Sequence, residues 1–160
     1  MNRRALIAFL LALPLAYAWA QRPEATKPQP ALPIEKLVIA GKDGQSHTFN
    51  VEMATTFEQQ EVGEMFRTVV PEDSGMLFVW SAPQVSQMWM KNTLVPLDMV
   101  FINADGTIRS IAENTVPKSL ATIDSRGPVL ATLELAGGVT AKLNIKVGDT
   151  VQFHLFGTAK

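Results

Sequence analysis

The chain has 160 residues, with 14 Lys and Arg against 15 Asp and Glu, and it contains no Cys. This length predicts a single domain, and a net charge of -1 lacks the surplus of basic residues that nucleic-acid binding requires. Without Cys, the chain has neither disulfides nor a thiol nucleophile, and zinc–thiolate and iron–sulfur sites are excluded.

The first twenty residues have the order of a secretory signal peptide. Arg3 and Arg4 precede an apolar run that continues to Ala20 and ends in small residues. The run is shorter than a membrane-spanning helix and Pro14 interrupts it, so we expect cleavage after Ala20, or alternatively after Ala18, and no membrane span afterwards. The predicted location is therefore the periplasm or the extracellular space.

Residues 21–33 contain four prolines and only scattered apolar side chains. Because proline removes backbone donors and favours extended geometry, this segment is predicted to be a disordered tether. Residues 34–160 are then expected to form one β domain, which is long enough to build a core without disulfides.

Short apolar segments of strand length, separated by Gly, Pro and Asp turns, fill this domain. The segments are residues 37–39, 48–51, 76–80, 85–91, 98–103, 107–112, 129–135 and 150–156. Hairpin turns are predicted at residues 41–44 and 103–106. One helix is predicted to begin at a capping-box pair, Thr55 and Glu58, and to end before Pro71. The pattern favours a mainly β fold, an antiparallel sandwich or jelly-roll-like barrel with one short helix.

Trp89 and Lys91 alternate with Met88 and Met90 along one of these segments. If the methionines face the core, the indole and the ammonium project together from the other face. A Trp beside charged and amide groups can stack a sugar or a planar ring while its polar neighbours bind the edge. In the alternative interpretation a loop covers Trp89 and Lys91 only lies over it.

Asp98 opens a strand that is predicted to be buried on both faces, where a carboxylate needs a partner. Lys91 and Arg67 are the candidate partners. A structural ion pair or turn cap and a ligand-binding or catalytic acid are both open for Asp98. Glu134 is expected to point to solvent, because it alternates with two leucines.

Seven side chains are candidates for binding a ligand. They are Arg67, Asp73, Trp89, Lys91, Asn92, Thr93 and Asp98. Neither His47 nor His154 has a second ligand at metal spacing, so no metal site and no cofactor are predicted. Neither GxSxG nor HExxH occurs, so any enzyme built on this chain would depend on carboxylates, Lys or Arg.

Three strings of the sequence resemble the bacterial and archaeal family called domain of unknown function 192. They are residues 63–67, 73–78 and 89–98, of which Trp89-Met90-Lys91-Asn92-Thr93 is the most specific. With shorter matches elsewhere, the resemblance covers roughly residues 37–156. It implies a compact, mainly β domain that is often exported, and it supplies neither an established reaction nor catalytic residues.

We therefore expect an exported, non-catalytic module that binds an envelope glycan or another small polar ligand. One alternative is a carboxylate-based glycan hydrolase or lyase, with Asp98 as base and Asp73 or Glu113 as acid. Another is a scaffold or interaction domain in which the same residues stabilise the fold. The sequence defines no oligomeric state.

Overall fold

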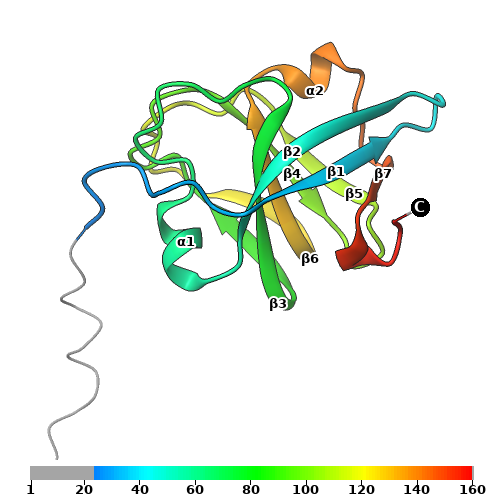
Figure 1. Ribbon diagram of the computed structural model, residues 1–160, viewed down its shortest axis with the longest axis horizontal. Helices are drawn as coiled ribbons and strands as arrows, with labels where there is room; N and C mark the ends of the chain where they lie inside the picture. The colour runs from blue at the N-terminus through cyan, green and yellow to red at the C-terminus, as the bar shows by residue number, and fades with distance from the viewer. Residues whose placement is uncertain (1–23, 160) are drawn as a thin grey trace, which may run out of the picture.

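The computed structural model describes residues 24–159. Over this range the chain forms seven strands, two short α-helices and a C-terminal 3-10 helix (Figure 1). The strands are β1 (Ile34–Ala40), β2 (Ser46–Ala54), β3 (Ser74–Met88), β4 (Leu97–Ile102), β5 (Ile108–Ala112), β6 (Ile123–Ala136) and β7 (Thr150–Gln152). The helices are α1 (Phe57–Val62), α2 (Val139–Lys142) and the 3-10 helix η2 (His154–Phe156). The mainly β fold class is confirmed. The predicted signal peptide lies outside the described residues.

All seven strands belong to one curled sheet, in the order β5-β4-β6-β3-β2-β1-β7. Neighbouring strands are antiparallel except β2 and β3, which run parallel because α1 and the turn after it carry the chain back before β3 begins. At the two edges, Ile108 N donates to Asp149 O at 2.9 Å and Val151 N donates to Gly106 O at 2.8 Å. These few bonds link β5 and β7 at one place only. The sheet as a whole is curled into a half-barrel.

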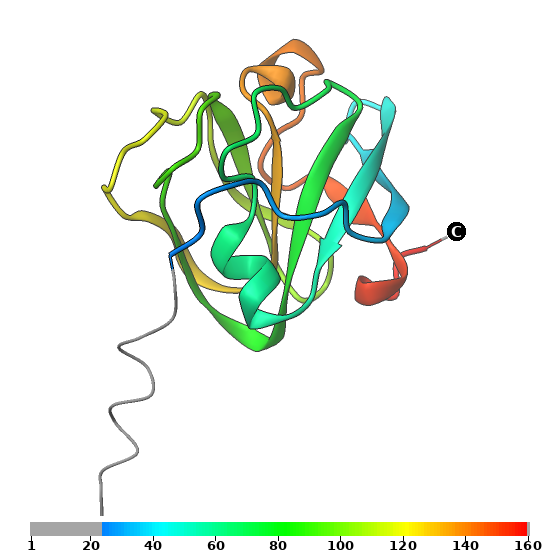
Figure 2. The same cartoon turned by 60° about the vertical axis from the view of Figure 1, so that its left-hand side comes forward.

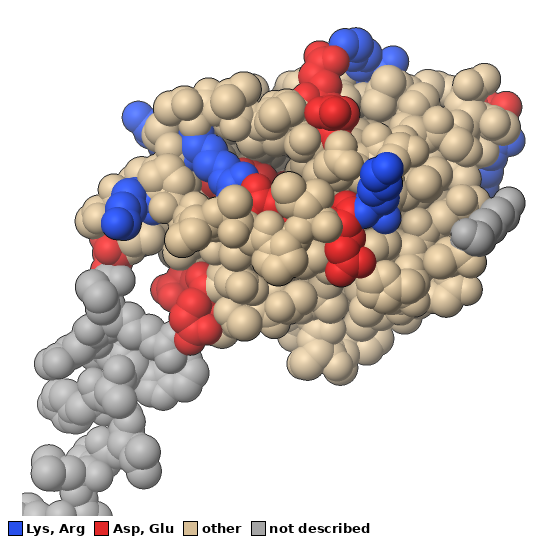
Figure 3. All heavy atoms as spheres, in the orientation of Figure 1, with Lys and Arg blue, Asp and Glu red and all other residues tan. Residues whose placement is uncertain are grey.

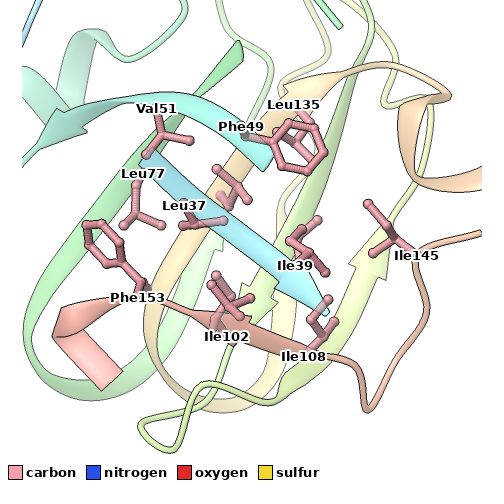
Figure 4. Close-up of a cluster of buried hydrophobic side chains, with 14 of the residues drawn as sticks. Leu37, Ile39, Phe49, Val51, Leu77, Ile102, Ile108, Leu135, Ile145 and Phe153 are labelled. Atoms are coloured by element: carbon pink, nitrogen blue, oxygen red, sulfur yellow. The ribbon is translucent and has the colours of Figure 1, made fainter. Parts of the chain in front are cut away.

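The main hydrophobic core lies on the inner side of the curled sheet (Figure 4). Every strand contributes to it, because alternate residues face inward. Buried core residues include Leu37, Ile39, Phe49, Val51, Leu77, Ile102, Ile108, Leu135, Val151 and Phe153. Strand β4 is buried at every position, as its sequence predicts. Its second face belongs to a smaller apolar cluster with Met90 on the outer face of the sheet.

Helix α1 is shorter than predicted, and its cap is one residue later. Thr56 is the N-cap: its Oγ1 accepts from Gln59 N at 3.3 Å, and Gln59 Oε1 accepts from Thr56 N at 3.0 Å. The helix ends at Val62, because Gly63 adopts a φ of 49°. Arg67, which the predicted helix would include because it lies before Pro71, therefore lies beyond α1, in the connection to β3.

Residues 24–33 run along the domain beside α1 (Figure 2). Gln29 Nε2 donates to Gln59 O and Gly63 O, at 3.1 and 2.9 Å, and so satisfies carbonyls at the end of α1. Leu32 packs against the cluster around Phe78. The disordered tether predicted for this segment does not describe residues 24–33. The prolines favour the extended path as expected, but the Gln29 amide and the Leu32 side chain attach it to the domain.

Strand β3 passes very close to β6 at Gly75. A Cβ at this position would lie 2.3 Å from Glu134 O and 2.8 Å from Leu135 Cδ2. We expect Gly75→Ala to lower the free energy of unfolding by about 1 to 3 kcal/mol, because the strands must separate to admit the methyl group. Urea unfolding followed by circular dichroism measures the effect, with Ser74→Ala as the control. An unchanged urea midpoint would show that β3 and β6 can separate at this position without a loss of stability.

Candidate functional site

A cavity of about 600 Å³ lies on the outer face of the sheet, between α1, the far part of β3 and the segment after it. We call it the outer cavity. Its apolar wall includes Phe57, Met65, Phe78, Trp80, Met88 and Trp89. Its polar groups include Gln60, Glu64, Gln84, Gln87, Lys91 and Glu134. An apolar hollow with a few polar groups is the usual form of a site for a small ligand.

The strand register places the floor of the outer cavity. Met76 on β3 lies directly opposite Glu134 on β6, so their side chains share the outer face. Phe78 and Trp80 follow Met76 at intervals of two residues and share that face too. The β3–β6 register shifts between Val79 and Gln84, and the strand irregularity lies where β3 borders the cavity.

Trp89 and Lys91 stand together at the rim of the outer cavity, as the sequence predicts. The Lys91 Nζ lies 5.2 Å from the centroid of the Trp89 ring, within range of a cation–π contact, and it forms an ion pair with Glu24. Trp89 is 46% exposed. Both residues follow the end of β3 at Met88, in a turn where Asn92 has a φ of 55°, and do not lie on a strand.

The same two side chains also border a second cavity of about 460 Å³, which we call the side hollow. Its lining adds Asn92 from the turn and Ala25 from the N-terminal segment. Trp89 and Lys91 therefore line both cavities.

Behind the outer cavity lies a cluster of charged side chains, Arg67, Glu52, Glu64 and Glu134. Arg67 donates two hydrogen bonds to Glu52, at 2.5 and 2.9 Å, and its Nε lies 3.1 Å from Glu64 Oε2. Leu32 N also donates to Glu52, at 2.8 Å. Glu64 is 3% exposed and Glu134 is 4% exposed. The guanidinium is thus already held by two carboxyl groups.

Two polar atoms at this cavity lack a hydrogen bond with any residue from 24 to 159. They are Glu64 Oε2, whose approach to Arg67 lacks hydrogen-bond geometry, and Trp80 Nε1. Buried polar atoms are nearly always hydrogen-bonded, and leaving one unpaired costs about 1 to 3 kcal/mol. Both residues line the outer cavity, and Glu64 Oε2 has the Arg67 guanidinium 3.1 Å away as an ionic neighbour.

Burial dominates the protonation of these acids. It raises the pKa of Glu64 to about 7, with Arg67 acting against it and Glu52 adding to it. Burial, reinforced by Glu64, also raises the pKa of Glu134 well above its ordinary value, although Arg67 opposes it. Burial acts on Glu52 as well, but the hydrogen bonds from Arg67 and Leu32 outweigh it and its pKa is lowered.

Asp98 has a structural role of the capping kind that the sequence analysis left open, but with partners other than those expected. It is fully buried, and it accepts hydrogen bonds from Asn114 N, Gly138 N and both the backbone N and Oγ1 of Thr140, at 2.6 to 2.9 Å. These four donors are its hydrogen-bond partners, in place of the lysine or arginine that we expected. Asp98 therefore ties two connections to the start of β4 and does not line the outer cavity.

The other predicted residues divide between the cavities and other surfaces. Trp89, Lys91 and Thr93 line the outer cavity, Asn92 lines the side hollow, and Arg67 backs the floor. Asp73 lies in an exposed turn, where it accepts from Ser74 Oγ, and Glu113 is exposed as well. Neither of these two acids borders the outer cavity.

Sequence analysis missed Glu64, Trp80 and Glu134. The prediction that Glu134 points to solvent is wrong: Glu134 is 4% exposed, between the buried Met76 of β3 and Met99 of β4. A signal was present: Glu134 alternates with leucines in a strand whose neighbours, at Met76 and Met99, are apolar on both faces. Because both faces of the sheet are covered at this position, the carboxyl group of Glu134 is kept from bulk water.

Across residues 24–159, no group of three or more His, Cys, Asp or Glu side chains is arranged to hold a metal ion. No helix of the described residues is long and apolar enough to cross a membrane. The two histidines lie apart, with His154 exposed near Glu35 and His47 on β2. On the face seen in Figure 3, acidic and basic side chains are interspersed.

The curled sheet and its outer cavity define a small β domain with a preformed hollow. The family model of domain of unknown function 192, described as "Uncharacterized ACR", matches residues 38–153. The chain belongs to this family. No curated protein matches it.

Two solved structures are similar over most of the chain. One, described as a candidate transcription regulator from Sinorhizobium meliloti 1021, is 42% identical, with a TM-score of 0.77, and the match covers 79% of this chain and 98% of that one. The other, a protein of unknown function from Novosphingobium aromaticivorans DSM 12444, is 39% identical, with a TM-score of 0.75, over 81% of this chain and 91% of that one.

Proposed function

We propose that this protein is an exported, non-catalytic module that binds a small polar ligand containing a ring, such as a unit of an envelope glycan, in the outer cavity. The observation that carries this proposal is an aromatic hollow with two buried polar atoms, Trp80 Nε1 and Glu64 Oε2, that form no hydrogen bond within residues 24–159. A ligand with hydroxyl or amine groups would satisfy both atoms, and the gain would favour the bound state.

The aromatic side chains at the rim and floor give this ligand its second set of contacts. Trp89 exposes a ring face beside the Lys91 ammonium, which suits stacking with a polar group held at the edge. Trp80 and Phe78 lie deeper, with ring centroids 6.3 Å apart. Rings that are already packed lose little conformational entropy when a ligand binds.

The hydrolase alternative loses its assigned residues. Asp98 is sealed and fully hydrogen-bonded, while Asp73 and Glu113 lie on exposed surface away from the outer cavity. A glycosidase needs two carboxyl groups on either side of one bond in an open cleft, and these three acids do not provide that arrangement. The scaffold alternative stays as the outcome that the binding experiment tests.

A thermal-shift screen with mono- and disaccharides and soluble peptidoglycan fragments tests the proposal. A ligand present at about 100 times its Kd should stabilise the protein by about 2.7 kcal/mol and raise its Tm. We expect Trp89→Ala and Lys91→Ala to keep the fold and lose the shift, because they remove the stacking face and the rim ammonium.

Leu120→Ala is the matched control, since Leu120 is 69% exposed and lies outside both cavities. It should keep the ligand-induced shift. If no probe raises the Tm, and the two rim variants change only the Tm of the free protein, the scaffold alternative is correct.

A further inference from the structure

We infer that the ligand carries a protonated amine, and that this amine is seated at the floor of the outer cavity between the carboxyl groups of Glu64 and Glu134. The inference rests on the proposed function, because it names the chemical class of the ligand for the same cavity. It follows from which charged groups around the cavity are already paired and which are not.

The cations at the cavity already have anionic partners. Arg67 holds Glu52 through two hydrogen bonds and lies 3.1 Å from Glu64, and Lys91 is paired with Glu24. An anionic ligand would have to displace one of these carboxylates to gain a partner. The geometry therefore gives an acidic or phosphate-bearing ligand no free cation at the floor.

The acids at the floor have unused capacity. Glu64 and Glu134 line the cavity and each is more than nine-tenths buried. Glu64 Oε2 lies 3.1 Å from Arg67 Nε, in an ion pair without hydrogen-bond geometry, and so can still accept a hydrogen bond. Glu134 interacts with its charged neighbours, Glu64 and Arg67, at longer range. A third acid, Glu61, lies exposed at the rim. A donor with a positive charge is the group that these acceptors fit best.

The walls above the acids also suit an ammonium. Phe78 and Trp80 present aromatic surface next to Glu134, and ring faces attract cations. Glu64 and Glu134 are 3% and 4% exposed, and such burial strengthens a contact between opposite charges. A ring on the ligand would then reach toward Trp89 at the rim.

Charge stays balanced when such a ligand binds. In the empty cavity, burial raises the pKa of both floor acids and so favours their protonated forms. As the ammonium enters, a proton leaves to solvent and the carboxylate formed accepts the N–H groups of the ligand. One positive charge replaces another, while the Arg67–Glu52 pair is unchanged.

A matched pair of probes tests this inference on the whole protein. The first is cyclohexylmethylamine, a primary amine that is cationic at neutral pH, as the Lys reference pKa of about 10.4 indicates. The second is cyclohexylmethanol, which has the same ring and a neutral hydroxyl group. We expect calorimetry to show at least about tenfold tighter binding of the amine, the size of a charge-assisted hydrogen bond. The indole N–H resonance of Trp80 should shift with both probes.

Variants assign the preference to the floor acids. Glu134→Gln and Glu64→Gln keep the side-chain shape and remove the charge, so each should bring the amine to the affinity of the alcohol. Glu61→Gln removes an acid from the rim and should retain most of the preference. Thermal unfolding of each variant confirms that it folds, and either floor variant alone is sufficient for the comparison.

Each remaining outcome overturns the inference in a different way. If the amine and the alcohol bind equally and shift Trp80, the amine inference fails and the proposed function stands. If Glu61→Gln alone abolishes the preference, the cation sits at the rim and the floor site is wrong. If neither probe moves the Trp80 resonance, the floor does not bind such groups, and only the screen with glycan probes still supports the proposed function.

Discussion

Replacing Asp98 with asparagine is expected to lower the free energy of unfolding by about 3 to 5 kcal/mol. Both carboxylate oxygens of Asp98 accept backbone N–H groups, from Asn114 and Gly138 on one and Thr140 on the other. An amide keeps one acceptor and turns a donor toward the remaining N–H groups. At least one buried backbone donor then loses its partner and its charged acceptor.

Urea unfolding measures the loss in free energy of unfolding of Asp98→Asn, and hydrogen exchange shows which part of the fold is destabilised. Amides of Gly138 and Thr140 should exchange faster in Asp98→Asn, because the start of α2 is no longer tied to β4. Asp73→Asn is the control, since Asp73 is exposed, and should change stability by less than about 0.5 kcal/mol. A loss below about 1 kcal/mol in Asp98→Asn would contradict an anchoring role.

Stability should fall as the pH rises from mildly acidic values through neutrality. The folded protein holds the proton of Glu64 with a pKa of about 7, whereas the ordinary value is 4.5. The contribution of Glu64 to the free energy of unfolding is therefore fully present below pH 4.5. It is lost as the pH rises through about 7, and the change amounts to roughly 3 kcal/mol. Glu134 acts in the same direction, since its pKa is raised as well.

Glu52 has the opposite effect on the pH dependence of stability, because its pKa is lowered in the folded protein. Its contribution is present above the ordinary value of 4.5 and is lost as the pH falls through the folded pKa. The protein should thus be most stable in the mildly acidic range. Thermal unfolding at a series of pH values measures the slope.

Glu64→Gln should flatten that slope between pH 5 and 8, because an amide resembles the protonated acid and does not titrate. Glu61→Gln, at an exposed position of α1, should leave the slope as it is. If Glu64→Gln and the unaltered protein show the same pH dependence, Glu64 is ionised in the fold and the outer cavity has a charged floor at neutral pH.

Periodicity predicted most of the strands because it reports burial directly. Both faces of β4 are apolar in sequence, and both are buried. The hairpin at residues 103–106 forms as expected, with Gly106 at a φ of 82°. The parallel pairing of β2 with β3 was not predictable in this way, because the alternation of a strand carries no information about the direction of its neighbour.

The candidate site was half predictable. Trp89 and Lys91 are two residues apart, so local geometry alone brings them together. Glu64, Trp80 and Glu134 come from three separate segments, and only the pairing of β3 with β6 and the return of the chain after α1 place them around one cavity. The partners of Asp98 were not predictable for a similar reason, since they lie 16 to 42 residues further along the chain.

The folded domain includes residues of the N-terminal segment that lie before the family match. The family match begins at residue 38, in the middle of β1, whereas Leu32 N is bonded to the carboxylate that holds Arg67. Fragments trimmed to the matched range would leave Glu52 without that amide and remove Gln29 from the end of α1. Any force or protease that detaches the leading segment would therefore alter the charges beneath the outer cavity.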